Sequence, residues 1–204
     1  MPAAERGDTG PEQRFELDLL QPVQSIEVAV VGSSDLDSVV ALARREMAGV
    51  RVKDAAVARV YRHNPVSIFA FRRGGKIVGS VAYLYLTEEG LDRLLLNAID
   101  FADPDIAILS PPSMQPSAIY FWALVARGHV GAGLGGTNAW TCASPYARAN
   151  YYARPSSDDG RRFVQRYGFE RMQGYQQDLW RYQRLCNRAA IERIEKRASL
   201  LHAA

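Results

Sequence analysis

The feature that most constrains this chain is a glycine-rich segment that directly follows its longest apolar run. Residues 117–136 read S-A-I-Y-F-W-A-L-V-A-R-G-H-V-G-A-G-L-G-G. The first half is rich in aromatic and β-branched residues, which is typical of a strand buried on both faces. The second half holds five glycines within residues 128–136. Glycine lets the backbone adopt positive φ and approach a ligand closely.

A helix that follows such a loop points its free N–H groups back into it. These groups carry partial positive charge and bind anions such as a pyrophosphate. Residues 128–136 therefore predict an anion-binding loop, and five glycines are more than an ordinary strand-to-helix turn needs. The extent of this helix has two alternatives: a short piece over 135–138, or a longer one that extends through Trp140. A further short strand is predicted over 138–144.

The length and composition predict a single domain with enough apolar residues to form a hydrophobic core. The chain has 204 residues, of which 48% are hydrophobic and 23% charged. Its longest apolar run is far shorter than the roughly 20 residues of a membrane span. Residues 1–10 lack the apolar segment of a signal peptide, so we expect a cytoplasmic protein. The net charge of +3 is too small to predict a nucleic-acid partner.

The cysteines and histidines do not form a metal-binding pattern. Cys142 and Cys186 show no C-x-x-C spacing, and His63, His129 and His202 are scattered along the chain. Structural and catalytic metal sites use clustered ligands of these types. We therefore expect no metal.

The N-terminal part predicts a tail, a strand and two helices. Residues 1–24 are polar with three prolines and are expected to be a mostly mobile tail. The strand runs from residue 25 and ends at Gly32. Ser33 or Ser34 is expected to cap the first helix, and a second helix covers 53–62. Apolar residues of the tail are available to dock on the domain, namely Phe15, Leu17, Leu19 and Leu20.

A hairpin and an insertion follow. The strand-like runs 67–73 and 76–86 flank Gly74-Gly75, which suits a tight type I′ or II′ turn. Thr87 is expected to cap a short helix that ends near Ala98. Residues 100–116 contain four prolines and predict an irregular connection. We treat 87–116 as an insertion.

The last part of the chain predicts a loop, a helix, a strand and a final helix. Residues 145–155 form an aromatic and basic loop. The run S-S-D-D over 156–159 opens a helix with a capping signature, and Gly168 ends this helix. One strand covers about 170–180, and a basic amphipathic helix runs from 182 to the C-terminus. The whole order indicates an α/β (α+β) fold with one mixed sheet and helices packed on it.

Two blocks of this sequence resemble the GNAT superfamily of N-acyltransferases. The run V-A-R-G-H-V-G-A-G-L-G over 125–135 resembles the family's acyl-CoA signature, in which a hydrophobic strand leads into Arg/Gln-x-x-Gly-x-Gly/Ala. The run F-V-Q-R-Y-G-F over 163–169 resembles the F-Y-x-x-x-G-F that ends a later helix. The resemblance implies a mostly antiparallel central sheet of about six to seven strands, in a domain covering 25–182.

The resemblance also implies where an acyl-CoA would bind. Backbone groups of the strand, at Ala123 and Val125, would pair with the pantetheine arm. The acyl thioester would lie near 121–123, and an amine acceptor would attack it directly from the opposite side. The remaining cofactor-binding positions implied are Val130, Gly131, Ala132, Gly133, Leu134, Gly135, Gly136 and Ser157.

This chain departs from the family's pattern at three positions. The Arg or Gln at the head of the signature is Val130, so backbone amides alone would hold the phosphates. The Tyr that often protonates the leaving thiolate is Val164. The frequent Asn at the start of the later helix is Ser157.

Other residues must therefore supply acid and base. Tyr152 and Tyr151, in the predicted loop, are the preferred candidate acids. Tyr120 and Tyr167 are also available, but a tyrosine in a strand or beside Gly-Phe is more often a core residue. Asp105 is the preferred candidate base, and a helix cap or turn is the competing explanation for it. The neighbouring carboxylates considered are Glu88, Glu89 and Asp103.

The expected function is transfer of an acetyl or other acyl group from acyl-CoA to a primary amine. One alternative is a non-catalytic acyl-CoA-binding or regulatory module. Another is an enzyme that acts on a protein or charged-tRNA amine. The C-terminal part, 183–204, is expected to be a solvated helix or to pack in a homodimer. The acceptor is not identified by the sequence.

Overall fold

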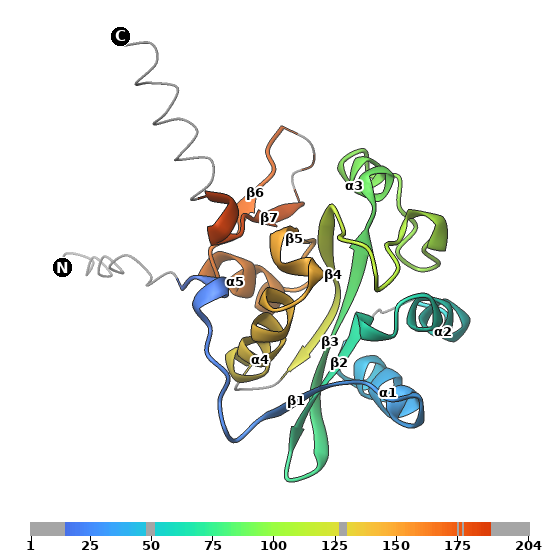
Figure 1. Cartoon of the computed structure of the whole chain (residues 1–204), viewed down its shortest axis with the longest axis vertical. Helices are drawn as coiled ribbons and strands as arrows, with labels where there is room; N and C mark the ends of the chain where they lie inside the picture. The colour runs from blue at the N-terminus through green and yellow to red at the C-terminus, as the bar shows by residue number, and fades with distance from the viewer. Residues whose placement is uncertain (1–14, 48–51, 127–129, 175, 177, 189–204) are drawn as a thin grey trace, which may run out of the picture.

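The computed structural model describes residues 15–47, 52–126, 130–174, 176 and 178–188. Within these residues, seven strands form one sheet in the order β1-β2-β3-β4-β5-β7-β6. Figure 1 shows α1, α2 and α3 on one side of this sheet and α4 and α5 on the other. All neighbouring strands are antiparallel except β4 and β5, which run parallel. The prediction of a mixed, mostly antiparallel sheet of six to seven strands is confirmed.

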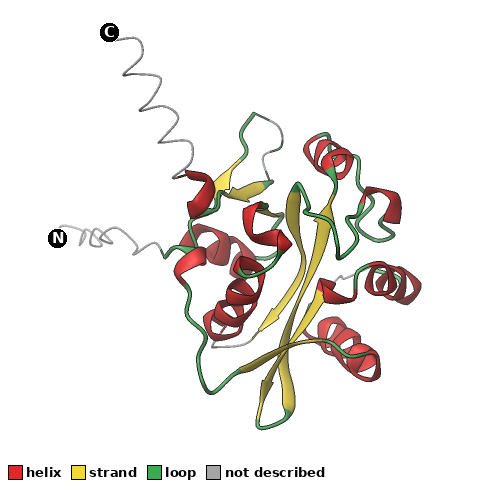
Figure 2. Cartoon of the chain, in the orientation of Figure 1, coloured by secondary structure: helices red, strands yellow, loops and turns green. Residues whose placement is uncertain are grey.

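Figure 2 distinguishes the helices, strands and loops by colour. The strands are β1 (Glu27–Val30), β2 (Ile68–Arg73), β3 (Lys76–Leu86), β4 (Ala118–Ala126), β5 (Asn150–Ala153), β6 (Glu170–Arg171) and β7 (Trp180–Tyr182). The labelled α-helices of the described residues are α1 (Leu36–Glu46), α2 (Asp54–His63), α3 (Glu88–Leu95), α4 (Val130–Cys142) and α5 (Asp158–Arg166), and residues 185–188 are also helical. In the described part of the chain, no helix is long and apolar enough to cross a membrane.

The hairpin and two helix caps are confirmed. Gly74 and Gly75 have φ of 55° and 75°, the two positive values that a type I′ turn requires. The Thr87 hydroxyl accepts the N–H of Gly90, and the Ser157 hydroxyl accepts that of Gly160. These side chains satisfy N–H groups that the first turn of a helix leaves without a partner.

The predicted serine cap of the first helix is wrong. Ser33 and Ser34 lie instead in a 3₁₀ turn, and Asp35 occupies the N-cap position of α1 without a side-chain cap bond. The Asp35 carboxylate accepts from Arg72 at 2.7 Å, so a contact with β2 replaces the cap.

The glycine-rich segment is a helix over most of its length. α4 begins at Val130 and runs to Cys142, so the predicted loop over 131–136 and the predicted strand over 138–144 are both wrong. Gly128 lies outside the described residues. Because strand and buried helix both read as apolar runs, periodicity does not distinguish them here.

Three of the glycines let α4 approach its neighbours closely. A Cβ atom on Gly133 would lie 2.6 Å from the ring of Phe71, and one on Gly136 would lie 2.6 Å from Val28. A Cβ atom on Gly135 would overlap the backbone carbonyl oxygen of Gln21. These glycines cost the helix backbone entropy, which the close packing offsets.

Two more segments differ from the prediction. The predicted loop over 145–155 contains a 3₁₀ turn, Pro145–Arg148, and then strand β5. The predicted single strand over 170–180 is two short strands, β6 and β7. The polar turn between them breaks the pattern that a continuous strand would need.

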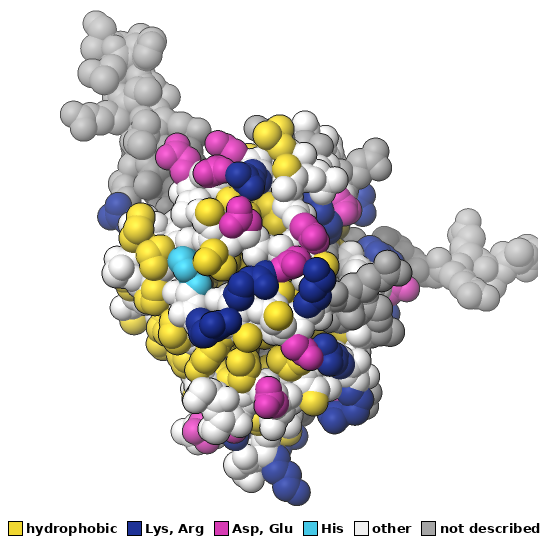
Figure 3. All heavy atoms as spheres, turned by 90° about the vertical axis from the view of Figure 1, so that its right-hand side faces the viewer, with side chains coloured by type: hydrophobic (Ala, Val, Ile, Leu, Met, Phe, Trp, Pro, Cys, Tyr) yellow, Lys and Arg dark blue, Asp and Glu magenta, His cyan; other side chains and the backbone are white. Residues whose placement is uncertain are grey.

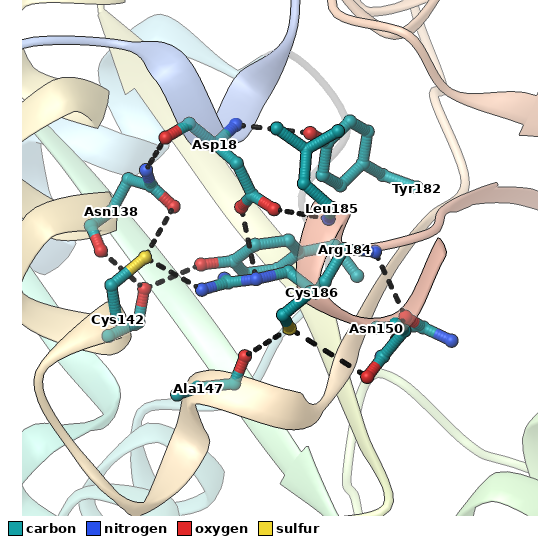
Figure 4. A network of polar contacts seen from close by, with 12 residues as sticks. Asp18, Asn138, Cys142, Ala147, Asn150, Tyr182, Arg184, Leu185 and Cys186 are labelled. Carbon is teal, nitrogen blue, oxygen red and sulfur yellow. Dashed lines mark hydrogen bonds and ion pairs between the residues drawn. The ribbon is translucent and has the colours of Figure 1, made fainter. Parts of the chain in front are cut away.

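The N-terminal segment docks on the domain from residue 15 onward, and Leu17 is 1% exposed in the main core cluster. Asp18 is the centre of the contacts in Figure 4. Its carboxylate lies 3.0 Å from Nε of Arg184 and accepts the N–H of Leu185 at 2.7 Å. Asn138 of α4 donates to its backbone carbonyl at 3.1 Å. The segment thus ties α4 to the residues after β7.

The packing role of Gly135 predicts that Gly135→Ala destabilises the protein. Alanine improves helix propensity by about 1 kcal/mol, but the added methyl must displace the Gln21 backbone, and overpacking of this kind costs about 1–3 kcal/mol. Chemical denaturation should therefore show a lower midpoint. Gly174→Ala is the matched control, because a Cβ atom there meets nothing within 4 Å. Equal midpoints for the two variants would contradict the assignment.

Candidate active site

Strands β4 and β5 part from each other soon after they meet. Their parallel pairing covers only three pairs and ends at Tyr120 with Tyr152. β4 then continues to Ala126, whereas β5 ends at Ala153. Among the described residues, no second strand pairs with β4 beyond Tyr120. This opening, which we call the wedge, leaves backbone N–H and C=O groups of β4 without strand partners.

A β-bulge lies at the mouth of the wedge. Ala82 pairs with Ala123 and Tyr83 pairs with Phe121, so Trp122 is the extra residue on β4. Bulges are frequent beside active sites because they redirect a side chain and interrupt strand pairing. Trp122 packs against the clusters under α1, α2 and α3.

The N-terminus of α4 follows β4 closely in the sequence. The N–H groups of the N-cap residue and of the first three helical residues have no acceptor within a helix, and in the described part of α4 these belong to residues 130–132. The N–H groups of residues 133–136 lie deeper in the helix, where helical geometry gives them carbonyl partners. The predicted anion-binding backbone therefore moves toward the start of the segment. Arg127 and His129 lie outside the described residues.

Helix α5 packs on the α4 side of the wedge. Phe163 and Phe169 place their rings 6.0 Å and 5.9 Å from the ring of Phe121 on β4. Val164 is 1% exposed in the same cluster. Ser157, a predicted cofactor contact, uses its hydroxyl to cap α5.

Comparison with known proteins gave structural matches only. No family model and no curated protein matches the sequence. The loading GNATL domain of CurA from Lyngbya majuscula matches with a TM-score of 0.55 at 15% identity, over 78% of this chain and 97% of that chain. The chain has the GNAT fold. The GphF GNAT-like decarboxylase in complex with isobutyryl-CoA matches with a TM-score of 0.51 at 18% identity, over 68% of this chain and 71% of that chain.

In this GNAT fold, Tyr151 and Tyr152 lie in strand β5, so their predicted placement in a loop is wrong. Both are buried, at 1% and 5% exposure. The Tyr151 hydroxyl lies 2.7 Å from that of Thr141 on α4. Burial raises the pKa of Tyr151, and it also raises the pKa of Tyr120. Both phenols therefore keep their protons at neutral pH.

The candidate carboxylates lie in the insertion and have local partners. Asp105 caps a single 3₁₀ turn by accepting the N–H of Ala107 at 2.9 Å. Asp103 accepts from Lys53 at 3.1 Å and from Arg59. The hydrogen bond from Lys53 is the main cause that lowers the pKa of Asp103. Asp103 is thus a weak proton acceptor.

One contact at the wedge has no signal in the sequence. The Trp122 indole N–H donates to the backbone carbonyl of Phe101 at 2.9 Å, and the Phe101 ring stacks on Tyr120 with centroids 4.4 Å apart. Phe101 belongs to the irregular part of the insertion. Its partners lie about twenty residues further along the chain, where no local pattern indicates pairing.

Proposed function

We propose that this protein binds an acyl-CoA in the wedge and transfers its acyl group to a primary amine. The observation that carries the proposal is the short parallel pairing of β4 with β5, which leaves a backbone edge open along β4. That edge leads toward the free N–H groups of α4. The edge offers hydrogen bonds to an extended chain of amides, and the helix start offers a site for phosphates.

The cofactor would lie along β4 with its acyl end at the bulge. The pantetheine amides would pair with backbone groups of Ala123 and Val125, as an added strand does. The pyrophosphate would accept from the N–H groups of residues 130–132. The partial positive charge of the helix start favours the phosphates, although Val130 supplies no charged side chain.

The transfer needs one proton acceptor and one proton donor. The amine nitrogen attacks the thioester carbonyl carbon, the C–N bond forms, and the C–S bond breaks. The amine loses a proton, and the leaving thiolate gains one. Asp105 or an ordered water is the proposed acceptor; the Asp105 side chain is 56% exposed.

Tyr152 is the proposed proton donor, because it belongs to the last parallel pair before the wedge opens. Tyr151 is the matched control, because its hydroxyl bonds Thr141 on the other face of β5. We expect Tyr152→Phe to lower turnover about tenfold or more with unchanged CoA affinity, as for loss of a general acid. Thiol release with acetyl-CoA and a panel of primary amines measures this. Equal turnover in Tyr152→Phe and wild type would remove Tyr152 from the mechanism.

Val130→Pro tests the phosphate site without a change of side-chain charge. Proline is favoured at the first position of a helix, so the fold should be retained. The substitution removes one free N–H, and a hydrogen bond to a charged group contributes about 1.5–3 kcal/mol. Calorimetry should therefore show CoA binding weakened roughly tenfold or more. Unchanged affinity with an unchanged unfolding midpoint would place the phosphates elsewhere.

A second candidate is decarboxylation of a carboxyacyl-CoA. The observation that favours it is Val164, which is buried at 1% exposure. At this position the GNAT family often has a tyrosine that acts as the general acid. In this reaction the C–C bond to the carboxylate breaks, CO₂ leaves, and the electron pair forms a thioester enolate that takes up a proton. The C–S bond stays intact, so no acid toward sulfur is needed. The GphF protein of the same fold is a GNAT-like decarboxylase.

Malonyl-CoA separates the two candidates. Conversion to acetyl-CoA without free thiol, followed by mass spectrometry, would support decarboxylation. Free thiol together with an acylated amine would support the first proposal. Binding of acyl-CoA without formation of either product would indicate a non-catalytic acyl-CoA-binding module.

A further inference from the structure

We infer that residues 100–103 of the insertion, which we call the strap, restrict the acceptor to a small amine and exclude protein and tRNA acceptors. The inference rests on the proposed function, because it concerns the acceptor side of the same wedge. Phe101 is the residue that sets the restriction. It is neither the proposed acid nor the proposed base.

The strap is fixed to the sheet where the wedge begins. The Phe101 ring stacks on Tyr120 with an interplanar angle of 19° and a centroid distance of 4.4 Å. The guanidinium of Arg154, the residue after β5, lies 5.6 Å from the centre of the same ring. Trp122 donates to the Phe101 carbonyl at 2.9 Å. Phe101 therefore connects the point where β4 stops pairing with β5 to the residue that follows β5.

The strap is also fixed to α2. Asp103 pairs with Lys53 at 3.1 Å and with Arg59. The backbone carbonyl of Ala102 accepts the N–H of Lys53 at 3.4 Å. The Asp100 carboxylate accepts the N–H of Ala102 at 2.9 Å, which closes the strap into a turn. Two anchors on different elements make displacement of the strap costly.

The position of the strap decides what reaches the thioester. Phosphates at the start of α4 would occupy the α4 side, so the amine must approach from the side of α1, α2 and α3. On that side Phe101 covers Tyr120 and lies beside the bulge at Trp122. A small amine can reach the wedge beside one aromatic ring, whereas a folded protein or tRNA would have to displace the strap.

The surrounding surface does not favour an RNA acceptor. Figure 3 shows this face with acidic side chains interspersed among the basic ones. Binding of RNA relies on basic surfaces that neutralise several phosphates. The described residues of this face present no uniform basic area of that kind.

Phe101→Ala tests the inference against two controls. Phe101→Tyr keeps the stacked ring, and Met114→Ala removes a 54% exposed apolar side chain from the same insertion. The probes are tyramine, spermidine and a ten-residue peptide with a free N-terminus, with thiol release from acetyl-CoA as the readout. Hydrolysis of acetyl-CoA without amine reports water access to the thioester. Calorimetry with acetyl-CoA is run on every variant.

We expect wild type, Phe101→Tyr and Met114→Ala to acylate the small amines and to leave the peptide essentially unreacted. Phe101→Ala should raise kcat/KM for the peptide about tenfold or more, mostly through a lower KM. Changes in pocket shape as small as one methylene group alter discrimination between substrates by about tenfold or more. It should also raise hydrolysis of acetyl-CoA.

Wild-type acylation of the peptide at the rate of the small amines would overturn the inference and leave the proposed function standing. Unchanged peptide acylation and unchanged hydrolysis in Phe101→Ala, with acetyl-CoA still bound, would also overturn it. If no amine reacts but acetyl-CoA binds, faster hydrolysis of acetyl-CoA in Phe101→Ala than in wild type and both controls supports the inference that the strap restricts access to the thioester. Absence of acetyl-CoA binding in wild type would overturn the proposed function, and the inference with it.

Discussion

The separation of β4 from β5 is the constraint on which the candidate site depends. A parallel pair that stops after three residue pairs leaves backbone groups at the centre of a sheet without partners. Unpaired backbone groups away from water are costly, so such an edge favours a ligand that can pair with it. The bulge at Trp122 and the strap at Phe101 lie at the same level of the sheet, which concentrates the irregular features of the fold at one place.

Close packing of α4 sets the other end of the site. Gly133, Gly135 and Gly136 let the helix lie against β1, β2 and the N-terminal segment. Its first turn, with free N–H groups, therefore begins shortly after β4. The ion pair of Asp18 with Arg184, whose side chains are 9% and 2% exposed, holds the C-terminal half of the helix, where Asn138 donates to Asp18 and Arg184 donates to Cys142. The glycines thus act on the site through the position of the helix.

The hairpin, the Thr87 cap and the capping run at 156–159 could be predicted, because each depends on local signals. Turn glycines and capping hydroxyls act within a few residues. The glycines of α4 were misread because their reason is tertiary: glycine serves a ligand loop and a tightly packed helix equally well. Trp122 and Phe101 were missed because a bulge and a stacking partner twenty residues away leave no local pattern. The resemblance in the sequence located the fold, whereas the catalytic roles of Tyr152 and Asp105 stay predictions.

The central claim is that an acyl-CoA occupies the open edge of β4 and the start of α4. Hydrogen–deuterium exchange of the intact chain, with and without saturating CoA, tests it most directly because it reports individual backbone amides. We expect slower exchange for amides of residues 121–132 on binding, with little change in β1 and β2. Binding of CoA with protection confined to other segments, or unchanged exchange throughout β4, would contradict it.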